Sequence, residues 1–163
     1  AMLCTDTIYD AIAQGSGFFQ HGHTYLGHPV ACAAAHAVVK KVMERRLLDQ
    51  VLAQGVSLRK ALTDKFGEHP NIGDVRGRGL FLGLEFVRER DSKSPFPPQL
   101  GFHKKFKQAA IDAGLICYPM GGTIDGQQGD HVLLAPPFII NSTHIEEIVS
   151  KLDQALKSTL RTL

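Results

Sequence analysis

Cysteine is scarce in this sequence, with Cys4, Cys32 and Cys117 the only three among 163 residues. An odd number of cysteines cannot all pair within one chain, and their wide spacing contains no Cys-x-x-Cys pair of the kind that binds zinc. This usage favours a reducing compartment, and we therefore expect a cytoplasmic protein.

Net charge and long apolar runs are lacking as well. The 18 basic and 16 acidic residues leave a formal charge of +2, which gives no electrostatic reason to expect nucleic acid or an anionic membrane as a partner. No apolar run approaches the roughly 18 residues that a membrane helix needs. The hydrophobic share of 44% and the charged share of 21% are globular proportions, and the length suits one ordinary domain.

The first 46 residues do not close a core by themselves. Residues 1–4 are apolar from the first position, with no initiating methionine, basic region or cleavage site, and we interpret them as the remnant of a strand in a fragment of a longer chain. Residues 5–29 are rich in turn-forming and polar residues, which predicts a loop. Beyond Pro29, apolar residues recur at three- and four-residue spacing and predict a helix with basic residues near its end.

Residues 47–163 carry the periodic patterns of a folded domain. The expected elements, in chain order, are a helix ending at Gly67, a strand in 80–87, a helix over 102–113, strands at 115–120 and 132–135 around a glycine-rich loop, and a final helix. Thr143 and Glu146 form a capping-box pattern at the start of that last helix. From about residue 72 the order is β-α-β-β-α, with two helices on one face of a small sheet. This order predicts an α/β fold of the α+β type, so we assign residues 47–163 to a small α/β domain.

Three histidines in the loop before Pro29 raise the question of a metal site. His21 and His23 would place two imidazoles on one side of an extended segment, and His28 follows. No carboxylate or thiolate lies at the usual ligand spacing, so we expect a polar loop and no metal. Thr24 differs, because a hydroxyl and an N–H group just ahead of a helix can bind phosphate, although helix capping is the commoner role.

The glycine-rich segments do not match a nucleotide-binding fingerprint. Gly77 and Gly79 precede a strand instead of linking a strand to a helix, and the 121–129 loop has neither a Lys-Ser/Thr pair nor a following helix. That loop is longer than a tight hairpin needs, so a lid or a substrate-facing role stays open. None of the ten lysines lies in an apolar setting that would lower its pKa, and we predict no catalytic residue in this chain.

Four segments together resemble one family. They are His21–Ala35 (HGHTYLGHPVACAAA), Asn71–Leu80 (NIGDVRGRGL), Gly114–Pro119 (GLICYP) and Leu133–Phe138 (LLAPPF). Their order and spacing resemble those of class III aminotransferases, the ω-aminotransferase group of fold type I, which depends on pyridoxal 5'-phosphate (PLP). The resemblance covers nearly the whole chain, and its first segment is the most specific.

The resemblance implies roles for particular residues. Thr24 would donate to the PLP phosphate of the neighbouring subunit, with His23 beside it as a second cofactor-binding residue, so the family works as a homodimer with shared sites. Residues 1–46 would then be the end of the large PLP-binding domain. The lysine that forms the Schiff base with PLP would lie before Ala1, so we expect this chain to be inactive alone.

Two departures from the family pattern bear on the substrate. Leu133 stands where many members that recognise an α-amino carboxylate such as glutamate have an arginine, and Tyr118 stands where several amine–pyruvate members use a mobile arginine. Tyr118 is therefore our candidate substrate-binding residue. A substrate carboxylate would have to be held by upstream residues, by Arg76 or Arg78, or not at all.

Three functions are consistent with these observations. The first is transfer of an amino group from an ω-amino acid or an amine to a keto acid such as pyruvate, in a homodimer. The second is an aminomutase of the glutamate-semialdehyde type, which is similar in scaffold. The third is a stand-alone α/β binding or interaction module derived from that scaffold.

Overall fold

The computed structural model describes residues 3–163. The chain divides into two compact units, Ala1–Lys41 and Val42–Leu163. The helices are α1 (Asp6–Gln14), α2 (Pro29–Glu44), α3 (Leu47–Phe66), α4 (Phe102–Asp112) and α5 (Ser142–Leu160), with a short 3-10 helix, η1, at Pro98–Leu100. The strands are β1 (Ile72–Arg78), β2 (Phe81–Phe86), β3 (Tyr118–Gly121) and β4 (Asp130–Leu134). No helix within residues 3–163 is long and apolar enough to cross a membrane.

The first unit contains α1, a loop and most of α2. The expectation of a loop throughout residues 5–29 is wrong for α1, where Ile8 and Ile12 lie one turn apart, Asp6 suits the positive end of the helix dipole, and the helix stops at Gly15. Residues 1–2 of the expected strand remnant lie outside the described residues, and Leu3–Thr5 form no strand. None of the described residues of this unit is buried.

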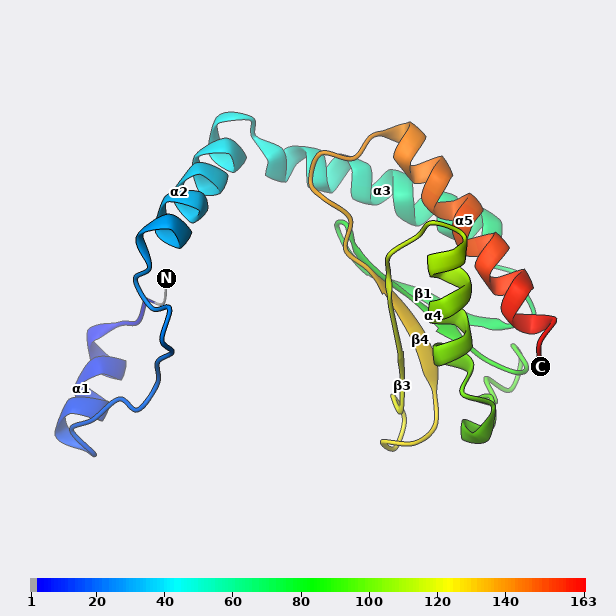
Figure 1. Ribbon diagram of the computed structural model, residues 1–163, viewed down its shortest axis with the longest axis horizontal. Helices are drawn as coiled ribbons and strands as arrows, with labels where there is room; N and C mark the ends of the chain where they lie inside the picture. Colours follow the sequence, from blue (N-terminus) through cyan, green and yellow to red (C-terminus); the bar gives the residue numbers. More distant parts are fainter. Residues whose placement is uncertain (1–2) are drawn as a thin grey trace. The chain divides into compact units, whose positions relative to one another are not determined.

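The second unit is built on one antiparallel sheet with the strand order β1-β2-β4-β3. Figure 1 labels β1, β3 and β4 of this sheet. The single strand expected in 80–87 is instead the second arm of a hairpin, since Arg78 pairs with Phe81 across the two-residue turn Gly79–Leu80. Gly79 adopts φ +56°, a left-handed conformation that glycine takes without strain. The observed order is therefore β-β-α-β-β-α, preceded by α3.

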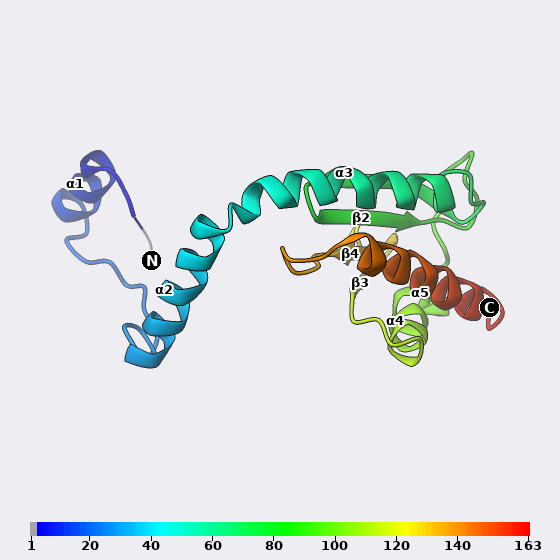
Figure 2. The ribbon, with the colours of Figure 1, turned by 90° about the horizontal axis from the view of Figure 1, so that it is seen from above.

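The core lies between one face of this sheet and three helices, one more than expected. The sheet contributes Leu82, Leu84, Phe86, Val132 and Leu134, while α3 contributes Leu58, Leu62 and Phe66, α4 contributes Phe102 and Phe106, and α5 contributes Leu152 and Leu156. Helix α5 packs on both α3 and α4, and Figure 2 shows it between them. Apolar side chains alternate along the strands and gather on the face that the helices cover. Within residues 42–163 no helix covers the other face, which we call the open face.

The backbone of helix α3 lies close against the backbone at the tip of the β1–β2 hairpin. A Cβ atom added to Gly55 would lie 2.5 Å from the carbonyl carbon of Gly79, so no side chain fits between them. Arg59, one turn further along α3, donates to the carbonyl of Gly77. The hairpin tip is therefore fixed to α3 by a close approach and a hydrogen bond.

The start of α5 differs from the expected capping box. Asn141 is the N-cap residue, and its side chain accepts a hydrogen bond of 3.1 Å from the His144 N–H, while the His144 ring accepts from the Asn141 N–H at 3.2 Å. Thr143 lies inside the first turn, because the helix begins one residue before it. The prediction of Thr143 and Glu146 as the capping pair is wrong by two residues.

Candidate functional site

Thr24 and His23, the predicted cofactor-binding residues, lie in a tight turn ahead of α2. The Leu26 N–H donates to the His23 carbonyl and the His28 N–H donates to the Tyr25 carbonyl, both at 3.0 Å. These bonds leave Thr24 exposed, and its hydroxyl has no hydrogen-bond partner in the described part of the chain. The turn thus presents a polar side chain to solvent.

The amino end of α2 adds hydrogen-bond donors next to this turn. Cys32 N–H donates to the His28 carbonyl at 3.0 Å, and the two preceding amides, Val30 and Ala31, have no acceptor among residues 3–163. Free amides at a helix start and an available hydroxyl are the groups that bind phosphate. The residues of this loop therefore fit the phosphate of a cofactor such as PLP.

Neither a metal centre nor a buried lysine is found in the described chain. Within residues 3–163 no group of three metal-ligating side chains is close enough to hold an ion, and the histidines of the loop are all exposed. None of the ten lysines is buried there either. A lysine that reacts covalently with an aldehyde needs a desolvated setting, which these lysines do not have.

Tyr118, the predicted substrate-binding residue, lies on the open face of the sheet. The register places Tyr118 opposite Leu133, Leu133 opposite Gly83, and Gly83 opposite Arg76. Residues directly opposite one another share a face, so these four form one row across the four strands. The structure thus brings together Tyr118 and Leu133, the two positions that depart from the family pattern.

Gly83 lies in the floor of a hollow in this open face. The hollow has a volume of about 290 Å³, and the side chains around it are those of Arg76, Phe81, Glu85, His131 and Leu133. Phe81, which lines the hollow, is 58% exposed, and Tyr118, which pairs with the lining residue Leu133, is 60% exposed, so this face presents aromatic surface to solvent. The hollow is apolar on the side of Phe81 and Leu133 and ionic on the side of Arg76 and Glu85.

A second row of residues crosses the same face beside the first. It consists of Asp74, Glu85, His131 and Met120. The hydrogen bond that Arg76 donates to Asp74 holds the pKa of Asp74 below its usual range. The hydrogen bonds that Arg76 donates to Glu85 and to Asp74 raise the pKa of Arg76. Burial lowers the pKa of His131, whose Nδ1 lies 2.8 Å from the Thr123 hydroxyl. His131 is therefore mostly neutral at physiological pH.

The sequence reasoning missed the carboxylates around Arg76. Asp74 and Arg76 are two residues apart, so they share one face once β1 is known to be a strand. Glu85 joins them only through the register of the hairpin, which pairs Glu85 with Asp74. The opposite charges at the alternate positions 74 and 76 were the sequence signal that could have predicted this contact.

A hydrogen-bonded contact to a buried carboxylate holds the sheet to α4. The carboxylate of Asp130, only 6% exposed, accepts from the His103 backbone at 3.2 Å, and the His103 ring nitrogen Nδ1 lies 2.7 Å from the same oxygen. A Cβ atom on Gly121 would lie 2.4 Å from the His103 ring, so glycine is required there. This contact positions the β3–β4 hairpin that carries Tyr118.

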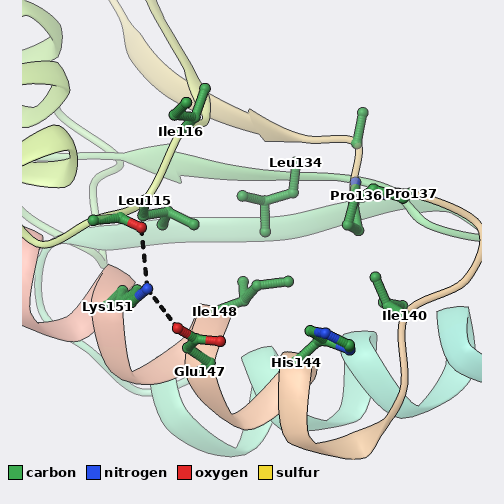
Figure 3. A pocket seen from close by; sticks show the side chains of 12 residues that line it. Leu115, Ile116, Leu134, Pro136, Pro137, Ile140, His144, Glu147, Ile148 and Lys151 are labelled. Carbon is green, nitrogen blue, oxygen red and sulfur yellow. Dashed lines mark hydrogen bonds and ion pairs between the residues drawn. The ribbon is translucent and has the colours of Figure 1, made fainter.

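A second hollow lies on the helix side of the unit (Figure 3). Its volume is about 300 Å³, and apolar side chains of Leu134, Ile140 and Ile148 project into it. At one end Lys151 donates to the Gly114 carbonyl at 3.0 Å and pairs with Glu147 at 2.6 Å. The charge of Lys151 is therefore paired with that of Glu147, and two of its three ammonium N–H donors are engaged.

Comparison with known proteins places this α/β segment in a class of enzymes. The fold matches part of a PLP-dependent transferase, and the family "Aminotransferase class-III" matches residues 1–156. The chain belongs to the class III aminotransferase family. The family and fold class predicted from sequence are confirmed.

Two relatives illustrate the match. The chain is 44% identical, over 96% of its length, to an aminotransferase of Gibberella zeae, of which it covers 31%. It is 35% identical, over 98% of its length, to "Gamma aminobutyrate transaminase 3, chloroplastic" of Solanum lycopersicum, of which it covers 29%. The chain thus spans about a third of the length of these curated relatives.

Solved structures agree with this assignment. An (S)-enantioselective omega-transaminase from Thermomicrobium roseum matches 96% of the chain with a TM-score of 0.79 and 33% identity, and the chain covers 33% of it. An aminotransferase from Vibrio fluvialis in its PMP-bound form matches 93% of the chain, with a TM-score of 0.75 and 34% identity, and the chain covers 32% of it. A mutant of an aminotransferase from the same organism is PLP-bound. PLP is therefore confirmed as the cofactor of the family.

Proposed function

We propose that this chain is the C-terminal part of a PLP-dependent aminotransferase that moves an amino group from an ω-amino acid or amine to a keto acid such as pyruvate. The observation that carries the proposal is the family match over residues 1–156, which includes the loop of Thr24. The chain supplies about a third of such an enzyme, and the remaining length would supply the lysine that holds the cofactor.

The two units contribute different functions in this proposal. In the first unit, the Thr24 hydroxyl, with His23 beside it, and the free amides at the start of α2 bind the PLP phosphate. The phosphate belongs to the neighbouring subunit, so the active form is a homodimer with shared sites. In the second unit, Tyr118 and the open face of the sheet line the substrate site and exclude water from it. Bound PLP supplies the carbonyl and electron-withdrawing ring needed to carry the amino group.

The same arguments define the expected partners and compartment. The partners are a small amino donor, a keto acid and a second copy of the chain, with no nucleic acid and no membrane among them. We propose the cytoplasm as the compartment, because Cys4 and Cys32 are exposed free thiols and Cys117 is a half-buried one.

One observation supports the alternative of a binding module. The second unit has a closed core of its own, formed by the sheet and helices α3, α4 and α5. A unit with such a core can persist without the rest of an enzyme. For the isolated chain we therefore retain a non-catalytic binding role as the second candidate.

A direct assay tests the proposed function. The isolated chain and a longer polypeptide that adds the missing two thirds of the family's length are each incubated with PLP, an amine and pyruvate, and alanine is measured. We expect alanine from the longer polypeptide and none from the isolated chain. Absence of alanine with every donor from the longer, PLP-loaded polypeptide would refute the proposal, and turnover by the isolated chain would refute the missing-lysine argument.

A further inference from the structure

Arg76 is the arginine closest to the hollow in the open sheet face, and it is already engaged by two carboxylates. Its Nη1 atom lies 3.0 Å from Oδ2 of Asp74 and 2.9 Å from Oε2 of Glu85. One positive and two negative charges leave this cluster with a net charge of −1. A further anion that approached Arg76 would therefore meet an excess of negative charge.

The other cationic candidates near the hollow do not replace Arg76. Arg78 lines a different hollow, which lies beside α3 with Gly77 and Gly79. His131 is half-buried and lies against Thr123, and burial disfavours its charged form. The side of the hollow formed by Phe81 and Leu133 offers apolar surface only. No free cation therefore lines the hollow among the residues that surround it.

We propose that this face selects donors whose end remote from the reacting amine is apolar, and that Glu85 is a specificity-determining residue because it keeps Arg76 from binding a carboxylate. The inference rests on the proposed function, since it takes the face that carries Tyr118 as substrate-facing. An alkyl or aromatic end covers Phe81 and Leu133 and removes their apolar surface from water.

The shape of the hollow above Gly83 supports the proposed selection of donors with an apolar end. Gly83 has no side chain, and a Cβ atom there would meet Leu133 Cδ2 at 3.3 Å and the Val132 carbonyl at 3.5 Å. The space above Gly83 is therefore bounded by a leucine side chain and by backbone, which suits a hydrocarbon chain. Asp74 and Glu85 occupy Nη1 of Arg76, so a carboxylate in this space could use only the other N–H groups of the guanidinium and would approach two negative charges to do so.

A binding experiment on the chain itself tests the role of Glu85 without PLP. Pentanoate is titrated while the side-chain Nε–H signal of Arg76 is followed by NMR, for the wild type, Glu85→Gln and the control Glu146→Gln, which makes the same charge change on α5. We expect a saturable shift in Glu85→Gln, with an affinity at least about fivefold above the other two proteins. Equal affinity for pentanoate in wild type and Glu85→Gln would overturn the proposal.

A kinetic experiment on the longer, PLP-loaded polypeptide tests the substrate class. Pentylamine and 5-aminopentanoate are compared by the rate at which each aminates the cofactor in the absence of keto acid. We expect pentylamine to be favoured by about tenfold or more, a ratio that corresponds to one charge-assisted contact. Glu85→Gln should reduce that ratio, and Leu133→Arg, which adds a free guanidinium beside Tyr118, should reduce it further.

The outcomes separate the inference from the proposed function. Amination that favours 5-aminopentanoate in the wild type refutes the apolar selection while the proposed function stands. No amination by any donor refutes the proposed function, and the inference with it. Melting temperatures of the variants, compared with that of Glu146→Gln, identify any loss of folding, and Asp74→Asn provides a second way to release Arg76.

Discussion

At the scale of single residues, Thr24 and Arg76 show opposite hydrogen-bonding states. The Thr24 hydroxyl is exposed and has no partner in the described chain, whereas Arg76 donates to two carboxylates. A group without a partner gains a full hydrogen bond from a ligand, while a guanidinium already paired with two carboxylates attracts a further anion less, because the charges of the three groups sum to −1. The first is thus suited to binding an anion and the second to excluding one.

Replacement of Thr24 tests its role in cofactor binding. A hydrogen bond to a charged phosphate contributes roughly 1.5–3 kcal/mol, so Thr24→Ala in the longer polypeptide should weaken PLP binding about 10- to 100-fold. Thr24→Ser keeps the hydroxyl and should cost much less. Equilibrium PLP titration followed by absorbance measures both, and equal loss in the two variants would contradict a role for the hydroxyl.

A mixed dimer shows whether Thr24 acts across the subunit interface. One subunit carries Thr24→Ala and the other lacks the cofactor lysine, so the site with the intact lysine meets the wild-type threonine of its partner. We expect this site to keep normal PLP affinity. Affinity as low as that of the Thr24→Ala homodimer would place the threonine in its own subunit's site.

The Asp74–Arg76 contact predicts a pH dependence. Because the pKa of Asp74 is lowered in the folded chain, its stabilising contribution is present above the unfolded-state value, about 3.9, and is lost as the pH falls through the folded value. Arg76→Gln should raise the Asp74 midpoint in an NMR titration. Asp125, whose pKa is lowered by the backbone of Gln128 and Gln127, should not respond. An unchanged Asp74 midpoint would contradict this assignment.

At the scale of elements, the helices with a continuous apolar stripe could be predicted from the sequence. In α5, Ile145, Leu152 and Leu156 recur with helical spacing and are all buried. Strand β1 could not be predicted in this way, because Gly73 and Gly77 interrupt the pattern and Arg76 carries a charge. What stabilises β1 is its pairing with β2 across the hairpin turn, and the periodicity of the β1 segment alone does not encode that pairing.

The candidate site could be predicted only in part for the same reason. Tyr118 and Leu133 were identified from the sequence, but their direct apposition follows from the β3–β4 register. The neutralisation of Arg76 follows from the β1–β2 register, and neither register can be read from residue types alone. Helix α1 shows a different failure, because the polar and glycine-rich residues around it led to the prediction of a loop where a helix forms.

The observed cap of α5 gives a prediction at this scale. Asn141→Ala removes the side chain that accepts from the His144 N–H, so it should destabilise the second unit by about 1 kcal/mol. Thr143→Ala changes a residue inside the first turn and should leave stability nearly unchanged. Chemical denaturation of both variants compares the two free energies of unfolding, and a larger loss for Thr143→Ala would contradict the cap.

At the scale of the whole molecule, the two units differ in what they bury. The second unit encloses a continuous core, whereas none of the described residues of the first unit is buried. Local stability follows buried apolar contact, so the two units should open with very different free energies.

Hydrogen exchange on the isolated chain measures this difference. Amides of α1 should exchange close to the rate of unstructured peptide, while the core amides of α3 around Leu58 and Leu62 should exchange orders of magnitude more slowly. Helix α3 serves as the internal reference for each time point. Protection of α1 equal to that of α3 would show that the first unit is stabilised by contacts that its exposure does not reveal.

The contact between Gly55 and Gly79 has a consequence for protein engineering. The tip of the β1–β2 hairpin and helix α3 meet with no room for a side chain between Gly55 and Gly79, and Arg59 donates a hydrogen bond to the Gly77 carbonyl. A transplant of the hairpin alone into a relative would bring Gly79 against whatever residue that relative has in place of Gly55. The segment to transfer is therefore the hairpin together with α3, and it should begin before Leu47, the first residue of α3.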